Sequence, residues 1–259
     1  MDLGKSYAIM ANDLSEVFSS RAIYLPMIAV PSFFAIMLPL LTFYISTYNI
    51  SGIASHIIGG VSPISGAALN GPVFMAYFSV YVLGPIFMTM PIFTAAVIAA
   101  DSFAGEKERK TSEALLSTPV TTSELLIGKM AASFIPAVVL TVAVFTIYGS
   151  VTNYLAYMAF HSYVLPSAAW ILMILLSPFL SLAAIGVVVL VSAHVQGIKE
   201  AQQISSLLIL PILVLPFASI LGIANLTTSF FFEVMLFLVV ADIAIIYFGI
   251  KSFRKETIL

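Results

Sequence analysis

The sequence predicts an all-α polytopic membrane protein: a single domain over residues 1–259 with six transmembrane helices and an amphipathic helix before them. The first reason is composition, since the chain is 61% hydrophobic and only 8% charged, whereas soluble domains are about 25% charged. The second is that the apolar residues form six stretches of roughly the 20 residues needed to cross a bilayer. The third is that every Lys and Arg falls on one side of these stretches.

Residues 3–20 have the pattern of a helix that lies on a membrane surface. Apolar residues recur at helical spacing on one side of this segment, and polar residues occupy the other. The apolar positions are Tyr7, Met10, Leu14, Val17 and Phe18. A helix with one apolar and one polar face binds in the plane of the interface, so we expect an interfacial helix here.

Hydropathy places the six membrane spans one after another along the rest of the chain. Their approximate ranges are 22–47, 74–100, 130–156, 167–193, 204–224 and 229–250. Proline occurs inside the first, second and fifth of these, and it is tolerated in spans because neighbouring helices can satisfy the freed carbonyls. We expect all three of these spans to be kinked at their prolines, since proline lacks a backbone N–H.

The orientation follows from the positions of the ten cations. Two precede the first span, four lie between the second and third, one lies between the fourth and fifth, and three follow the sixth. The positive-inside rule assigns this side to the cytoplasm. We therefore expect a multi-pass protein of the cell membrane with both termini in the cytoplasm. The net charge of −2 argues against a nucleic-acid partner.

One cytoplasmic stretch, residues 101–129, differs from everything around it. It holds nine charged residues: Asp101, Glu106, Lys107, Glu108, Arg109, Lys110, Glu113, Glu124 and Lys129. A charge at the centre of a bilayer costs about 2.5–3.5 kcal/mol on insertion scales, so we expect this stretch in water or at the interface. Pro119 ends one helix, and Thr121 with Glu124 forms the capping-box pattern of the next.

No enzyme site is visible in the sequence. Near Gly105 and Thr111, Arg109 stands where a phosphate-binding P-loop needs glycine, so we expect no ATP site of that kind. The three histidines lie on separate segments without metal-binding spacing, and the chain has no cysteine. We therefore expect neither a catalytic residue, a metal site nor a bound cofactor on this chain.

Two acidic residues fall inside the sixth predicted span. Glu233 lies about one turn from its outer edge, and Asp242 lies nine residues further on, near mid-membrane. At 100° per residue they point in roughly opposite directions, so they do not form a carboxylate pair. Ionisable residues within a membrane are candidates for a transport path. The alternative is that each acid holds helices together or, for Glu233, meets the outer solvent.

The charged stretch resembles the signature of ABC-2-type permeases. Residues 105–120 read GEKERKTSEALLSTPV, and the family pattern is roughly G-E-[RK]-E-x-G-T-x-E-x-L-L-x-T-P-V, followed by the G-K pair found here at Gly128 and Lys129. Lys110 departs from a usual glycine and Ser112 from a usual apolar residue. A second segment, residues 195–203 (VQGIKEAQQ), is similar to the family's V-[KR]-E-A-Q-Q.

The resemblance implies a transmembrane subunit that works with a separate ATPase. It makes residues of about 103–118 a coupling helix that docks in a cleft of a separate ABC ATPase subunit. Two copies of that subunit belong to the complete transporter and bind the ATP and Mg²⁺. By position, the docking residues are Glu106, Glu108, Arg109, Thr111, Glu113, Leu115 and Leu116. We expect this chain to pair with a second permease, identical or related, and to export a substrate. The scarcity of charge among the spans favours apolar or amphiphilic cargo.

Two other functional classes remain to be compared with this one. An ion- or proton-coupled carrier or channel would use Asp242 as its ion site and need no ATPase. An intramembrane enzyme would need a nucleophile with its base, or a metal set, and the sequence shows neither. Capture of an ABC ATPase together with this chain separates the first hypothesis from both alternatives.

Overall fold

The computed structural model describes residues 3–47, 71–109, 120–192, 195, 197–207, 210–212, 214 and 228–252. Within them all regular secondary structure is helical, and the connection 161–167 between two of the helices is irregular. The α-helices are α1 (Leu3–Ser19), α2 (Arg21–Thr47), α4 (Gly71–Tyr77), α5 (Gly84–Phe87), α6 (Thr89–Glu108), α8 (Thr122–Phe160), α9 (Ala168–Ser192), α10 (Ile198–Ser206) and α12 (Thr228–Ser252). A π-helical segment, Phe78–Leu83, joins α4 to α5.

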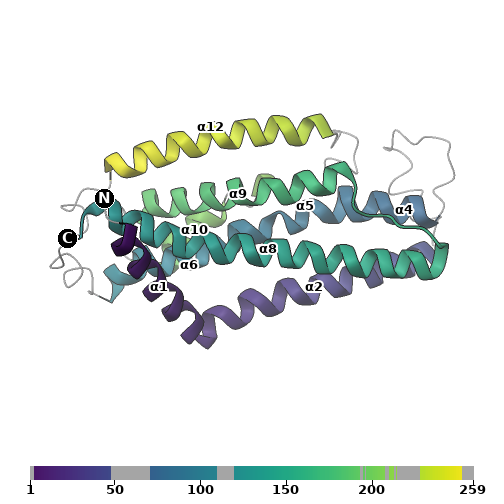
Figure 1. The fold of residues 1–259 in the computed structure, drawn as a ribbon, viewed down its shortest axis with the longest axis horizontal. Coiled ribbons are helices and arrows are strands. Elements are labelled where there is room, and N and C mark those ends of the chain that lie inside the picture. Colours follow the sequence, from purple (N-terminus) through teal and green to yellow (C-terminus); the bar gives the residue numbers. More distant parts are fainter. Residues whose placement is uncertain are drawn as a thin grey trace.

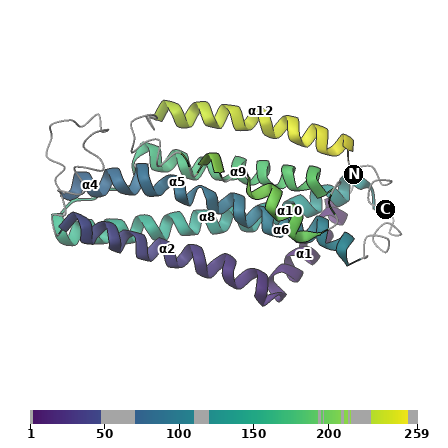
Figure 2. The same ribbon diagram turned by 180° about the vertical axis from the view of Figure 1, so that it is seen from behind.

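The long helices lie side by side in one elongated bundle (Figures 1 and 2). α6, α8 and α9 pack against one another at its centre, α2 covers α8, and α12 covers α9. Consequently α2 and α12 form opposite edges of the bundle in both views. α1 meets α2 at a sharp bend and packs on α8, while α10 packs on α6 and α9.

Five helical runs of the described residues are long and apolar enough to cross a membrane. They are Ile23–Thr47, Gly71–Glu106, Ser123–Phe160, Ala168–Ser192 and Thr228–Ile245. These runs coincide with the first, second, third, fourth and sixth predicted spans. The fifth predicted span, 204–224, lies largely outside the described residues. The multi-pass character expected from hydropathy is therefore present, in five candidate spans.

Small residues explain why α6 is central. Ala95, Ala99, Ala100 and Ala104 are all fully buried on this helix. Side chains of this size let two helix backbones approach closely, which is how helices associate inside a membrane, where burial of apolar surface gives no driving force. Towards the other end of the bundle the core is aromatic instead: the rings of Phe87 and Tyr148 lie 4.7 Å apart.

The second predicted span is interrupted near its prolines, as expected. The π-helical segment ends two residues before Pro85, which has no N–H for the regular α-helical pattern. Helix α6 begins at Thr89, so Pro91 falls in its first turn, where no N–H is needed within the helix. In the first span, where a kink is expected as well, α2 continues as one helix through Pro26, Pro31 and Pro39.

The polar start of the predicted coupling helix is not a separate element. Residues 103–108 form the last turns of α6, so the second span runs directly into the charged stretch. Residues 110–119, the rest of that stretch before the third span, lie outside the described residues. On its other side α8 begins with the predicted capping box, in which Thr121 and Glu124 each accept the other's backbone N–H at 3.3 and 3.0 Å.

Candidate functional site

The charged end of the bundle is organised around Lys129, two turns into α8. This side chain is only 2% exposed, although the sequence predicts that the charged stretch lies in water or at the interface. Its ammonium group donates to Glu106 Oε1 at 2.5 Å and to the backbone oxygen and Oγ of Ser102 at 2.7 and 3.1 Å. It also lies 5.5 Å from the ring centre of Phe103. The three donors of the ammonium group are therefore all used.

Asp13 brings α1 into the same cluster. The hydroxyl of Ser102 donates to Asp13 Oδ2 at 2.5 Å, and the same oxygen lies 3.7 Å from the Lys129 ammonium. Asp13, Ser102, Glu106 and Lys129, which we call the Lys129 cluster, thus join α1, α6 and α8. A buried charge is tolerated when it is paired and hydrogen-bonded. This explains how the cluster can be buried between α1, α6 and α8.

A second, more exposed set of ion pairs lies beside the Lys129 cluster. Arg109, at the end of α6, reaches Asp101 on its own helix and Glu16 on α1, both at 3.2 Å. Gly105 leaves room for this arrangement, because a Cβ there would come within 3.1 Å of the Arg109 guanidinium. The Arg109 and Glu16 side chains are about half exposed, so this pair contributes at most about 1 kcal/mol.

Glu108 extends the network to α10. Its Oε2 accepts the backbone N–H of Ile198 at 2.9 Å. The N-cap of α10 is Gly197, which has no side chain to satisfy the first N–H groups of that helix. Glu108 therefore supplies the missing acceptor and a negative charge at the positive end of α10.

The structure thus locates three of the seven predicted docking residues and not the other four. Glu106, Glu108 and Arg109 are at the end of α6, where their charges face α8, α10 and α1. Thr111, Glu113, Leu115 and Leu116 fall outside the described residues.

Sequence reasoning did not assign a role to Asp13, Ser102 or Lys129. The Gly128–Lys129 pair was the available signal, because a lysine at the start of an apolar span requires a partner. Position 128 requires glycine for a steric reason, because a Cβ there would lie 2.8 Å from the backbone oxygen of Ser6 and 2.9 Å from Cβ of Ile9. Glycine therefore allows α1 to rest directly on α8, which brings Asp13 within reach of Lys129.

The two acids of α12 lie in different environments, as their spacing predicts. Asp242 is only 4% exposed, and neither of its carboxyl oxygens has a hydrogen-bond partner among the described residues. Glu233 is exposed. They are therefore not a pair, and of the two only Asp242 is enclosed by protein.

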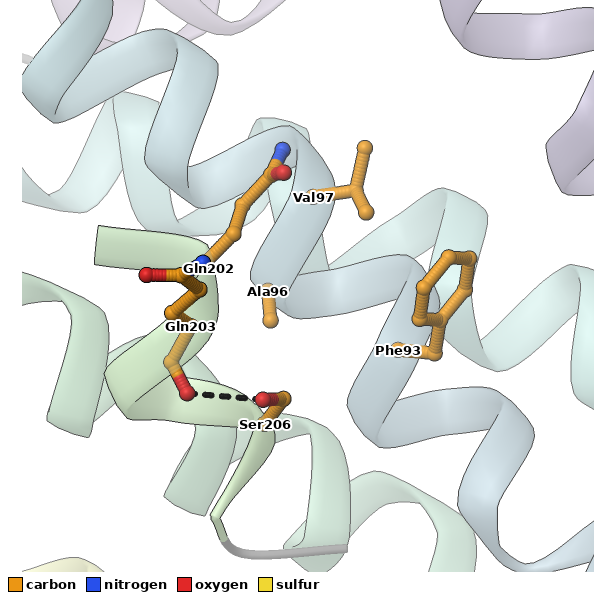
Figure 3. Close-up of a pocket in the computed structure, with 6 residues that line it drawn as sticks. All are labelled: Phe93, Ala96, Val97, Gln202, Gln203 and Ser206. Carbon is orange, nitrogen blue, oxygen red and sulfur yellow. Dashed lines mark hydrogen bonds between the residues drawn. The ribbon is translucent and has the colours of Figure 1, made fainter. Parts of the chain in front are cut away.

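A pocket of about 170 Å³ opens between α6 and α10 (Figure 3). Phe93, Ala96 and Val97 of α6 form its apolar wall, and Gln202, Gln203 and Ser206 of α10 form a polar one. The Ser206 hydroxyl donates to the backbone oxygen of Gln203 at 2.7 Å. Within the part of the chain that the structure describes, no three His, Cys, Asp or Glu side chains are grouped to hold a metal ion.

Comparison with known families gives a match that covers nearly the whole chain. A model described as "ABC-2 family transporter protein" matches residues 5–249. The match includes every helix that contributes to the Lys129 cluster and to the pocket. Comparison with curated proteins gives no match.

Proposed function

Because this chain belongs to the ABC-2 transporter family, we propose that it is the permease subunit of an ATP-driven exporter of the cell membrane. The family consists of multi-pass transport subunits that associate with an ABC ATPase and are not themselves catalytic. In the proposed complex two ATPase copies bind ATP and Mg²⁺ in the cytoplasm, where both termini of this chain also lie. The second permease is another copy of this chain or a relative.

The observation that carries the proposal is the Lys129 cluster. It ties the last turns of α6 to the first turns of α8. Between these helices lie residues 110–119, which contain the second half of the proposed coupling helix (about 103–118) and are called the docking segment here. Because Lys129 also reaches Asp13, α1 is held to the same point. A partner that grips the docking segment therefore cannot move one span alone. Its displacement is passed to the second span, the third span and α1 together.

The capping box supports the same transmission. Thr121 and Glu124 satisfy the first N–H groups of α8 within two residues of the docking segment. The helix is therefore firm from its first turn, and it continues for 39 residues, which is about 58 Å. Tilting its cytoplasmic end moves its outer end as well, which is what opening a path towards the outside requires.

α1 fits the predicted role of an interfacial helix. Leu3, Tyr7 and Phe18 are 73, 67 and 50% exposed, and they share one stripe of the helix. The neighbouring face is held against α8, and α1 meets the apolar span α2 at a bend. An exposed apolar stripe at the end of a membrane span is accounted for by lipid headgroups and the first methylenes of the bilayer.

The direct test is purification of the complex from its native membranes. We expect an ABC ATPase to accompany the chain, and Glu113→Arg combined with Leu116→Asp to release it while the permease still elutes as a folded protein. Glu200→Arg, a charge reversal on α10 outside the docking segment, is the matched control and leaves the ATPase bound. An ATPase that stays bound to the double variant, or never accompanies the chain, contradicts the coupling role.

A second candidate function rests on Asp242. A buried carboxyl without a partner is a possible ion or proton site, which favours an ion-coupled carrier. That function requires transport without any ATPase and its loss in Asp242→Asn. Reconstitution of the chain alone with an ion gradient distinguishes the two: we expect no transport until the ATPase and ATP are added.

A further inference from the structure

Residues 195–203, which resemble a family motif, have no part in the proposed coupling role. They end in two adjacent glutamines on α10, and both line the pocket against α6 (Figure 3). Gln202 is half-buried and Gln203 is exposed. Neither side-chain amide forms a hydrogen bond to another described residue. Two primary amides therefore border the opening, beside the Ser206 hydroxyl and opposite an apolar wall, with donors and acceptors still available.

The depth of this pocket in the membrane makes the amides informative. Asp101 is the first charged residue along α6, and Phe93 lies eight residues before it, about 12 Å deeper. Half of the hydrocarbon core is about 15 Å thick. The apolar wall therefore reaches into the inner leaflet. Gln202 and Gln203, which follow the charged Lys199 and Glu200 by about one turn, lie closer to the headgroups, and an amide there that faced only acyl chains would be costly. Something with hydrogen-bonding groups is expected to meet Gln202 and Gln203.

The two walls define the chemistry of that occupant. Phe93, 49% exposed, and Val97 offer apolar surface, while the opposite wall offers two amides and the Ser206 hydroxyl. No charged side chain lines the pocket. This combination suits a molecule with one apolar part and an uncharged hydrogen-bonding group. The nearest charges on α10, Lys199 and Glu200, are exposed, of opposite sign and outside the pocket lining.

We propose that this pocket is the site at which an amphiphile with an uncharged, hydrogen-bonding headgroup is taken from the inner leaflet as cargo. The acyl part lies on Phe93 and Val97, and the headgroup meets Gln202 and Gln203. The proposal rests on the exporter function and specifies its substrate class. The position of α10 also connects the site to the coupling end, because Glu108 binds the N-terminus of the same helix.

The first experiment locates the ligand and does not need ATP. The purified complex is placed in phosphatidylcholine vesicles that contain a diacylglycerol with a diazirine on one acyl chain, and labelled residues are mapped by mass spectrometry. Val139, 62% exposed on α8 and ten residues from Lys129, is the lipid-facing control at similar depth. We expect labelling of Phe93 and Val97 well above that of Val139, and loss of the excess in Ala96→Leu, which fills the pocket.

The second experiment asks whether the bound molecule is cargo. Diacylglycerol is titrated into the vesicles and stimulation of ATPase activity is measured. Changing Gln202 and Gln203 together to Leu is expected to raise the concentration for half-maximal stimulation about tenfold, the loss of roughly one or two hydrogen bonds. Retention of the ATPase subunit is measured on the same sample, to show that the variant complex is still assembled. The matched change Ile204→Leu, at an exposed position on the same helix, leaves the titration unaltered.

The results that overturn the proposal are distinct from failure of the exporter function. Equal labelling of the pocket and Val139 means that only bulk lipid is present. Labelling without stimulation means a resident lipid and not cargo. Cysteine cross-linking of Val97→Cys to a second copy of the chain means that the permease partner fills the pocket. If the ATPase subunit does not stay with the wild-type chain, the coupling role is contradicted instead. The photolabelling experiment still tests the pocket in that case, because it does not need ATP.

Discussion

Lys129 and Asp242 are both ionisable residues buried in long apolar helices, yet their surroundings are opposite. The Lys129 side chain is 2% exposed and contacts Asp13, Ser102 and Glu106 from two other helices. Asp242 is 4% exposed, and its oxygens have no hydrogen-bond partner among the described residues. Lys129 is at the charged end of the bundle, where it joins three helices, whereas Asp242 is on α12, which packs at one edge of the bundle (Figures 1 and 2).

This comparison predicts that the stability of the fold depends on the paired charge of Lys129 and not on the unpaired carboxyl of Asp242. Removing one member of a satisfied buried cluster leaves the other members unpaired and is strongly destabilising. Removing a group that has no partner leaves nothing behind unsatisfied. The following substitutions test this comparison, from the largest expected effect to the smallest.

Lys129→Met is expected to lower the free energy of unfolding by about 3–5 kcal/mol, because Asp13 and Glu106 stay buried without their cation. Chemical unfolding of the purified chain in detergent measures this loss. Adding Glu106→Gln to Lys129→Met should recover part of it, since one stranded charge is then removed. Lys199→Met, at an exposed position, is the control and should cost at most about 0.5 kcal/mol. A cost for Lys129→Met as small as the control's refutes the importance of the cluster.

Gly128→Ala disturbs the same region by adding a methyl group, without changing any charge. Its Cβ would lie 2.8 Å from the backbone oxygen of Ser6, so α1 must shift, and we expect a cost of about 1–3 kcal/mol. Gly149→Ala on the same helix is the matched control, because its Cβ would meet only ordinary contacts at 3.6–4.0 Å. It should leave stability unchanged or raise it by up to about 1 kcal/mol. Equal effects at the two glycines would show that α1 does not rest on α8.

Thr121→Ala removes the side-chain oxygen that accepts the Glu124 N–H and should cost about 1 kcal/mol. The change is local, so hydrogen exchange should rise in the first turn of α8 and not in the helix middle. Thr121→Ser keeps the hydroxyl and should preserve both stability and exchange. Unaltered exchange in Thr121→Ala would mean that the capping box does not hold this end of the helix.

Asp242→Asn should have the smallest effect, within about 0.5 kcal/mol of the unaltered chain or slightly stabilising. No hydrogen bond to a described residue is lost, and the replacement has the same size. ATP-driven transport by the reconstituted complex should also continue. A loss of stability comparable to that of Lys129→Met would mean that Asp242 has a partner, and a loss of transport with normal stability would favour the ion-coupled alternative.

The sequence was sufficient for several local features because each depends on neighbouring residues alone. Thr121 and Glu124 are three residues apart, so their reciprocal capping could be predicted and is observed. The opposite positions of Glu233 and Asp242 follow from helical spacing in the same way. The Lys129 cluster could not be predicted, because Asp13 and Ser102 are 89 residues apart and no spacing rule connects them.

The burial of charged side chains was also beyond the sequence. The free energy of inserting each charge separately into a bilayer predicts that the stretch 101–129 lies in water or at the interface. In the structure, Asp101, Glu124 and Lys129 are buried within the protein. The same limit applies to the pocket, whose two walls come from α6 and α10, about 100 residues apart in the chain. Partners from distant helices change the cost of burial, and only the packed bundle shows them.

By itself the sequence determined that this chain is a helical, multi-pass membrane protein, because a bilayer admits only long apolar segments that satisfy their own backbone groups. It also determined the ABC-2 character, through a motif contained in one continuous stretch. The tertiary structure decided which charges are neutralised inside the protein, which acid has no partner, and where two helices leave a pocket. These properties depend on distances between segments that the chain order does not specify, and only packing brings such segments together.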